Sequence, residues 1–102
     1  MLNSKQRSYL KKLAANEPDI LHVGKDELTP NLIVQAKDAL KSRELIKGKV
    51  QQNCLKDVRE VAEELSTSTD SDVVYTIGNK FVLYKRNHEE PKIEMPKSKK
   101  KK

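Results

Sequence analysis

The segment Ile20–Pro30 places the strongest limit on the fold. It reads Ile-Leu-His-Val-Gly-Lys-Asp-Glu-Leu-Thr-Pro: a short apolar run, a break at Gly24, a charged turn and a final Thr-Pro. Thr29 is a good N-cap, and a proline at the first helical position has no amide hydrogen to lose. The segment therefore predicts a strand, an exposed tight loop and a helix start. The free amides and partial positive charge of that helix start attract phosphate, and Lys25 lies on the loop that faces it.

Hydrophobic periodicity predicts that helices and strands alternate along the chain and that a hairpin turning at Gly78-Asn79 ends the folded part. The order helix, strand, helix, strand, helix, strand, strand implies an α+β fold. Its mixed four-stranded sheet would be partly parallel, packed with helices and bordered by an antiparallel edge. The predicted helices are Ser4–Asn16, Pro30–Lys41 and Asn53–Ser66, and the predicted strands are Asp19–Val23, Leu45–Gln51, Val73–Ile77 (beginning at Asp72 or Val73) and Phe81–Arg86.

The first predicted helix separates apolar from basic residues. Asn3 and Gln6 have the spacing of a capping box, and no acidic residue occurs between Met1 and Asn16. A helix that is merely solvated usually carries both signs of charge, so this face is either a solvated surface or a contact for an anion. At 3.6 residues per turn, one face has Gln6, Tyr9, Leu10, Leu13 and Ala14, and the other has Lys5, Arg7, Ser8, Lys11 and Lys12.

Charge is also segregated in two later elements. Lys47 and Lys49 alternate with Ile46, Gly48 and Val50, which predicts a strand with one basic face and one apolar or small face. Gly48 inside this run indicates a close backbone approach or a bulge. The third predicted helix is acidic, and we expect its carboxylates to point away from the basic surface; they are Asp57, Glu60, Glu63 and Glu64.

Composition limits the partner. The chain has 102 residues, 21 Lys and Arg against 15 Asp and Glu, a net charge of +6 and a pI near 9.4. We expect one domain over residues 1–86 and a disordered tail over 87–102, which holds six lysines and three glutamates and so half of the charge excess. The balance favours nucleic acid or an acidic membrane. No run is long enough to span a bilayer, no secretion signal is evident, and the single Cys54 fits a reducing cytoplasm.

The sequence resembles the stand-alone bacterial CRM-domain proteins of the YhbY type over almost the whole folded part. Each matching segment is short, and their order and spacing together carry the resemblance. The matching segments are Ser4–Arg7 with Tyr9–Leu10, Val23–Lys25, Leu28–Ile33, Arg43–Lys47, Arg59–Leu65 and Ile77–Tyr84.

This resemblance implies a fold similar to the C-terminal domain of bacterial initiation factor three and RNA binding through a Gly-x-x-Gly loop like that of KH domains. It also implies a cytoplasmic assembly factor for precursors of the large ribosomal subunit. Here the loop has Gly24, but Asp26 and Glu27 stand in its second half, which shifts weight to Lys25 and the basic helix. The candidate RNA-binding residues are Lys5, Arg7, Lys11, Lys12, Gly24, Lys25, Asn31, Lys80, Lys85 and Arg86.

The sequence lacks the residue patterns that base-stacking platforms, metal sites and catalytic sites need. The aromatic residues Tyr9, Tyr75, Phe81 and Tyr84 sit on periodic faces and are expected to be core rather than a base-stacking platform. His22 and His88 have no partner at metal-ligand spacing, and no nucleophile elbow or Walker loop is present. We therefore expect no enzyme, no metal, no cofactor, no small-molecule substrate and no membrane partner, and a monomer.

Two other functions remain open at this stage. The same fold could bind another structured RNA, as a translation factor or in contact with transfer RNA. Alternatively, the acidic third helix could be the working surface of a protein-interaction module, with the basic face serving solubility. Lys25 could then be a solvated loop residue, Gly24 a turn former, and Lys80, Lys85 and Arg86 a guard against edge-to-edge aggregation.

Overall fold

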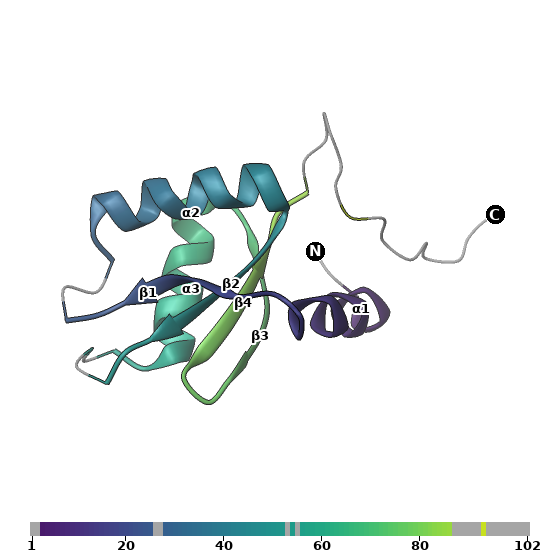
Figure 1. The fold of residues 1–102 in the computed structure, drawn as a ribbon, viewed down its shortest axis with the longest axis horizontal. Coiled ribbons are helices and arrows are strands. Elements are labelled where there is room, and N and C mark those ends of the chain that lie inside the picture. The colour runs from purple at the N-terminus through teal and green to yellow at the C-terminus, as the bar shows by residue number, and fades with distance from the viewer. Residues whose placement is uncertain (1–2, 26–27, 53, 55, 87–92, 94–102) are drawn as a thin grey trace.

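A computed structural model describes residues 3–25, 28–52, 54, 56–86 and 93 of the chain. The described residues form helices and strands in the predicted order (Figure 1). The helices are α1 (Ser4–Ala14), α2 (Pro30–Arg43) and α3 (Val58–Thr69), and the strands are β1 (Asp19–Val23), β2 (Leu45–Val50), β3 (Asp72–Ile77) and β4 (Lys80–Tyr84).

The strands form one sheet in the order β1-β2-β4-β3. β1 and β2 are parallel, whereas β4 is antiparallel to both of its neighbours, so the predicted mixed sheet is confirmed. The β3–β4 hairpin turns at Gly78, whose φ of +58° suits a tight two-residue connection. Figure 1 shows α2 and α3 on one side of the sheet and α1 beyond one end of the other side.

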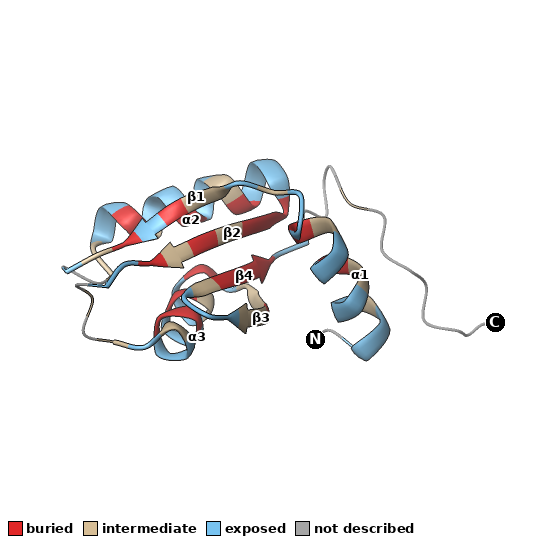
Figure 2. Ribbon diagram, turned by 60° about the horizontal axis from the view of Figure 1, so that its bottom comes forward, coloured by how far each residue is buried: buried red, intermediate tan, exposed pale blue. Residues whose placement is uncertain are grey.

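The core has one cluster on each face of the sheet. The larger cluster lies under α2 and α3 and includes Leu40, Val61 and Phe81, all buried. The smaller one lies under α1 and includes Leu10, Val74 and Tyr84. Figure 2 shows the buried residues of the helices on the sides that face the sheet. The predicted apolar face of α1 is confirmed for Leu10 and Ala14, which are buried, and α2 buries Leu32, Ala36 and Leu40.

Gly48 of β2 is opposite Phe81 of β4, and the Phe81 ring lies across it. A Cβ added at Gly48 would come within 2.3 Å of the ring carbon Cζ. The neighbour that requires glycine here is a side-chain ring and not the backbone or bulge that the sequence indicated, and the missing side chain gives Phe81 its place in the larger cluster.

The predicted bounds of the third helix were wrong at both ends. α3 begins after Asp57, whose carboxylate accepts hydrogen bonds from the amides of Arg59 and Glu60 at 2.7 and 3.1 Å. This side chain satisfies amides that no helical carbonyl reaches. At its other end α3 continues to Thr69, three residues beyond the predicted end at Ser66, and the hydroxyl groups of Ser66, Thr67 and Thr69 donate to carbonyls three or four residues back. The other predicted ends agree within about two residues.

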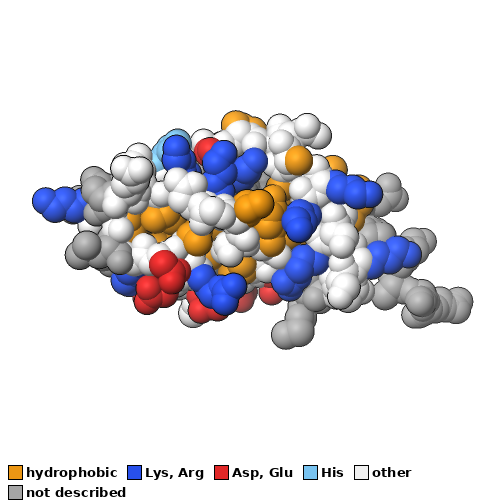
Figure 3. All heavy atoms as spheres, turned by 90° about the horizontal axis from the view of Figure 1, so that it is seen from below, with side chains coloured by type: hydrophobic (Ala, Val, Ile, Leu, Met, Phe, Trp, Pro, Cys, Tyr) orange, Lys and Arg blue, Asp and Glu red, His pale blue; other side chains and the backbone are white. Residues whose placement is uncertain are grey.

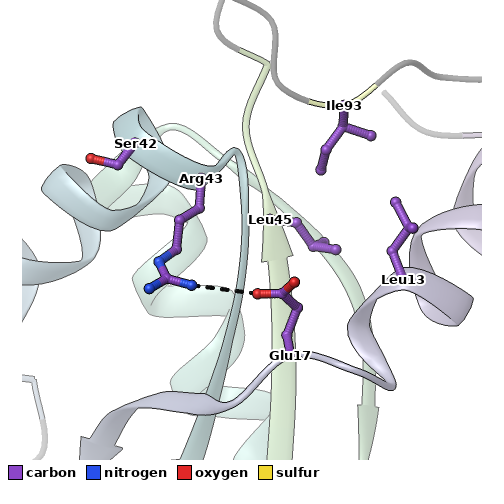
Figure 4. A pocket seen from close by; sticks show the side chains of 6 residues that line it. All are labelled: Leu13, Glu17, Ser42, Arg43, Leu45 and Ile93. Carbon is purple, nitrogen blue, oxygen red and sulfur yellow. Dashed lines mark hydrogen bonds and ion pairs between the residues drawn. The ribbon is translucent and has the colours of Figure 1, made fainter.

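α1 is tied to the rest of the molecule at its C-terminal end. Lys47 Nζ donates to the Ala14 carbonyl at 3.2 Å, and Arg43 Nη1 forms an ion pair with Glu17 Oε1 at 3.5 Å. Figure 4 shows this pair beside a pocket between α1 and the C-terminal end of α2. These contacts fix where the basic helix stands relative to the sheet.

One described residue lies in the segment that we predict to be a disordered tail. Ile93 packs against the smaller cluster, and its side chain points toward Leu13 and Leu45 (Figure 4). Its amide donates to Oε1 of the buried Glu44 at 2.6 Å. Residues 87–92 and 94–102 lie outside the described residues, so the rest of the tail prediction stays a prediction.

Candidate nucleic-acid interface

α1 covers only one end of its face of the sheet, and the strand register identifies the residues on the open remainder. His22 of β1 is the partner of Lys49 of β2, Lys49 is the partner of Lys80 of β4, and Lys80 is the partner of Ile77 of β3. Directly opposed residues point to the same face and lie about 4.5 to 5.5 Å apart. His22, Lys49, Lys80 and Ile77 therefore form one row across all four strands, which we call the cross-strand row.

The cross-strand row brings like charges together. Lys49 and Lys80 are directly opposed, and such a pair of like charges is destabilising. One carboxylate partly offsets it, because Asp19 Oδ2 lies 3.4 Å from Lys80 Nζ. Asp19 is also the strand partner of Lys47, so a third lysine borders the row. Cations concentrated in this way attract an anion.

The four basic residues of α1 divide into two pairs. Arg7 and Lys11 turn toward the edge of the sheet: Arg7 Nη1 donates to the Val74 carbonyl at 3.3 Å, and Lys11 Nζ lies 5.1 Å from the centroid of the Tyr75 ring. Lys5 and Lys12 are exposed. Arg7 and Lys11 therefore continue the charge of the sheet face onto the helix, and Lys5 and Lys12 extend it outward.

The β1–α2 turn lies at the end of the sheet opposite α1 (Figure 1). Lys25 is exposed and Gly24 is half-buried. The predicted helix start is confirmed, because Thr29 Oγ1 accepts a hydrogen bond from the Leu32 amide at 3.1 Å. Asn31 is exposed in the first turn of α2. The predicted contributions of Asp26 and Glu27 lie outside the described residues.

The three predicted basic residues that follow β3, Lys80, Lys85 and Arg86, lie in different parts of the structure. Lys80 belongs to the cross-strand row. Lys85 instead donates from Nζ to the carbonyl of Thr69 at 3.2 Å, at the C-terminal end of α3, where a cation stabilises the helix dipole. Arg86 is exposed next to it. This gives Lys85 a structural role, and Lys85 and Arg86 lie at the opposite end of β4 from the cross-strand row.

The acidic residues of α3 belong to the other layer. Glu60, Glu63 and Glu64 are exposed on α3, which packs on the face of the sheet opposite α1. Lys56 Nζ lies 2.6 Å from Glu64 Oε1 and neutralises part of this charge. Figure 3 shows basic and apolar side chains spread over one face, with most of the acidic side chains along its lower edge. The expected separation of the carboxylates from the basic surface is confirmed.

Sequence reasoning missed part of this surface. The alternation of Lys47 and Lys49 predicts the basic face of a strand, but it does not reveal that this face is the one left open beside α1.

The predicted core position of the aromatic residues is confirmed for Phe81 and Tyr84, which are buried, whereas Tyr9 and Tyr75 are half-buried. Burial raises the pKa of the Tyr84 phenol: desolvation is the largest cause and the Glu44 carboxylate the next, the Arg86 guanidinium lowers the pKa by less, and the smallest contribution, from Asp72, raises it.

The described part of the chain offers neither a membrane span nor a metal site. None of its helices is long and apolar enough to cross a membrane. Its His, Cys, Asp and Glu side chains nowhere come together in a group of three or more that could hold a metal ion. Cys54 is half-buried against the larger cluster.

The CRS1 / YhbY (CRM) domain family matches residues 2–85, nearly all of the described chain. The chain belongs to this family. Among its CRM relatives is the Bacillus subtilis protein named "Probable RNA-binding protein YqeI", which is 45% identical over 96 residues, 94% of this chain and 100% of the relative. A Haemophilus influenzae protein named "RNA-binding protein" is 34% identical over 95 residues, 93% of this chain and 95% of the relative.

A solved CRM-type structure supports the fold. The solution structure of SAV1595 from Staphylococcus aureus matches with a TM-score of 0.79 and 44% sequence identity, and the match covers 94% of this chain and 100% of that one. The helices and strands described above are therefore an arrangement that a related chain also adopts.

Proposed function

We propose that this CRM-domain chain binds RNA through the face formed by the cross-strand row and α1, and that it acts in the cytoplasm as a monomeric assembly factor for the large ribosomal subunit. The observation that carries the proposal is the opposition of Lys49 and Lys80. A sheet face that needed only solubility would balance its charges, whereas here Asp19 is a single carboxylate among Lys47, Lys49 and Lys80. This one holds two lysines together and is continued by Arg7 and Lys11 on α1.

The chemistry of this face suits the RNA backbone. Lysine and arginine neutralise phosphates and release condensed counterions, which makes the affinity strongly salt-dependent. The names of the Bacillus subtilis and Haemophilus influenzae relatives support RNA as the class of partner. Lys25, Gly24 and Asn31 at the β1–α2 turn add a second contact, at the end of the sheet away from α1.

Binding to RNA is tested by measuring the affinity for ribosomal RNA fragments over a range of salt concentrations. We expect the Lys49→Gln, Lys80→Gln double variant to weaken binding and to flatten the log–log salt dependence by roughly 0.7 to 1 unit for each phosphate that the variant no longer neutralises. Lys37→Gln is the matched control, because Lys37 is an exposed lysine on α2, in the other layer. Lys49→Gln and Lys80→Gln are also measured singly. If Lys37→Gln weakened RNA binding as much as either of them, the assignment to this face would be contradicted.

The ribosomal part of the proposal rests on the family and needs its own experiment. In a gradient of cell extract at low salt, the chain should sediment with precursor large-subunit particles, and high salt should release it. The double variant should stay near the top. If the wild-type chain stays at the top at low salt, its partner is a different RNA. Crosslinking followed by sequencing would then distinguish transfer RNA from initiation complexes.

One observation favours a second candidate, contact with a protein. A groove beside α2 and α3 is lined by the apolar Leu28 and Ile33 and by the acidic Glu63 and Glu64. Charge reversal at Lys11, Lys12 and Lys25 separates the two candidates. RNA binding should collapse in that variant if the basic face is the working surface, and partner capture through α3 should be unchanged.

A further inference from the structure

The open half of the sheet has an apolar side chain among its cations. Ile77 ends the cross-strand row and is 61% exposed. Tyr75 lies two residues earlier on β3, on the same face as its partner Val82, and is half-buried. We propose that an unpaired strand of RNA lies across the open half of the sheet, with bases against Ile77 and Tyr75 and phosphates at Lys49 and Lys80. This inference rests on the proposed RNA-binding function.

The dimensions of the sheet suit a short single strand. Neighbouring strands are about 4.8 Å apart, so the cross-strand row spans roughly 14 Å. A four-stranded sheet of this size holds two or three stacked bases in RNA-recognition domains. Because Ile77 and Lys80 are directly opposed, a base on Ile77 leaves its own backbone within reach of Lys80.

The chemistry favours an unpaired strand over a duplex. In an RNA duplex the base faces are stacked inside the helix, so the surface offered to a protein is phosphate, 2′-hydroxyl and base edge. Such a surface would contact the cations and leave Ile77 in contact with polar groups. An unpaired base instead covers apolar surface and stacks on an aromatic ring. Lys11 Nζ lies over the Tyr75 ring, 5.1 Å from its centroid, so a base that stacks on that face of the ring displaces this flexible side chain.

The experiment compares a fluorescently labelled single-stranded oligonucleotide with a duplex of the same sequence. The variant is Ile77→Thr, which keeps a β-branched residue in the strand and removes the apolar end. The matched control is Val34→Thr, since Val34 is 56% exposed and lies on α2, in the other layer. We expect Ile77→Thr to lower affinity for the single strand by roughly fivefold or more, with no change in the salt slope. Val34→Thr should have no effect.

A second variant pair tests the ring. Tyr75→Phe should keep single-strand affinity, and Tyr75→Leu should lower it, because stacking needs the ring and not the hydroxyl. Urea unfolding of each variant confirms that it is folded. The inference is overturned if Ile77→Thr and Val34→Thr bind the single strand alike, or if the wild type prefers the duplex. A wild type that binds neither form overturns the proposed function itself.

Discussion

Lys49 on β2 and Lys80 on β4 are direct cross-strand partners, so two ammonium groups share one face of the sheet. Like charges in this arrangement destabilise a sheet by a few tenths to about 1 kcal/mol. The Asp19 carboxylate forms an ion pair with Lys80, at 3.4 Å, and so offsets the repulsion only in part. The folded protein therefore holds a repulsion that a bound phosphate would remove, and affinity and stability should respond to it in opposite directions.

Lys49→Gln should weaken RNA binding while leaving the free energy of unfolding unchanged or slightly higher. Removing one charge relieves the repulsion by about 0.2 to 1 kcal/mol and removes one cation that would neutralise a phosphate. Urea unfolding and salt-dependent binding measure the two effects separately. Lys37→Gln on α2 should alter neither. A loss of stability that parallels the loss of affinity would instead mean that Lys49 supports the fold.

Gly48→Ala should destabilise the protein by about 1 to 3 kcal/mol, because the new Cβ would lie 2.3 Å from the Phe81 ring. Urea unfolding measures the loss. The double variant Gly48→Ala, Phe81→Leu should be less destabilised than the sum of the single variants, since leucine leaves room for the methyl group. Additive losses would show that the ring does not exclude a side chain at Gly48.

The pKa of the Tyr84 phenol is raised by burial and by the nearby Glu44 carboxylate. The folded state therefore keeps this proton to a higher pH than the unfolded chain, whose phenol ionises near pH 10. Its stabilising effect is complete below about pH 10 and is lost as the pH rises through the raised pKa. Tyrosinate absorbance should show a late-ionising component that Tyr84→Phe lacks. An unchanged titration curve in Tyr84→Phe would contradict this.

Asp57→Ala should cost about 0.5 to 2 kcal/mol of stability, because the side chain caps two amides at the start of α3. Asp57→Asn should cost much less, since asparagine caps nearly as well without the charge. Thermal unfolding of both variants makes the comparison. Equal losses would indicate that the charge, rather than the cap, stabilises this end.

The fold could be predicted because its local signals agree. Thr29-Pro30 marks a helix start, the short apolar run before it is too short for a helix, and Gly78 marks the hairpin, so each element is specified by nearby residues. The prediction placed α3 too early because its start depends on which of several polar residues caps it. Asp57 caps it in a capping box with Glu60, and at the other end the polar residues Ser66–Thr69 have no apolar periodicity that would mark them as helical.

The candidate site could be predicted only in part. The basic face of α1 follows from helical periodicity, which one segment of sequence contains. The cross-strand row depends on the register of four strands that are far apart in the chain, and on α1 stopping short of it. Lys49 and Ile77 belong to the same row only because each of them is a strand partner of Lys80. No pattern within either strand contains that information.

The most direct test of the central claim is a nitrogen-15 NMR titration of the whole chain with an unlabelled ribosomal RNA fragment. The account predicts that the largest amide shift changes fall on Lys47–Val50 of β2, on Lys80 of β4 and on Arg7–Lys11 of α1, and that they weaken as salt is added. Changes concentrated on Glu60–Thr67 of α3, with the cross-strand row unaffected, would contradict it.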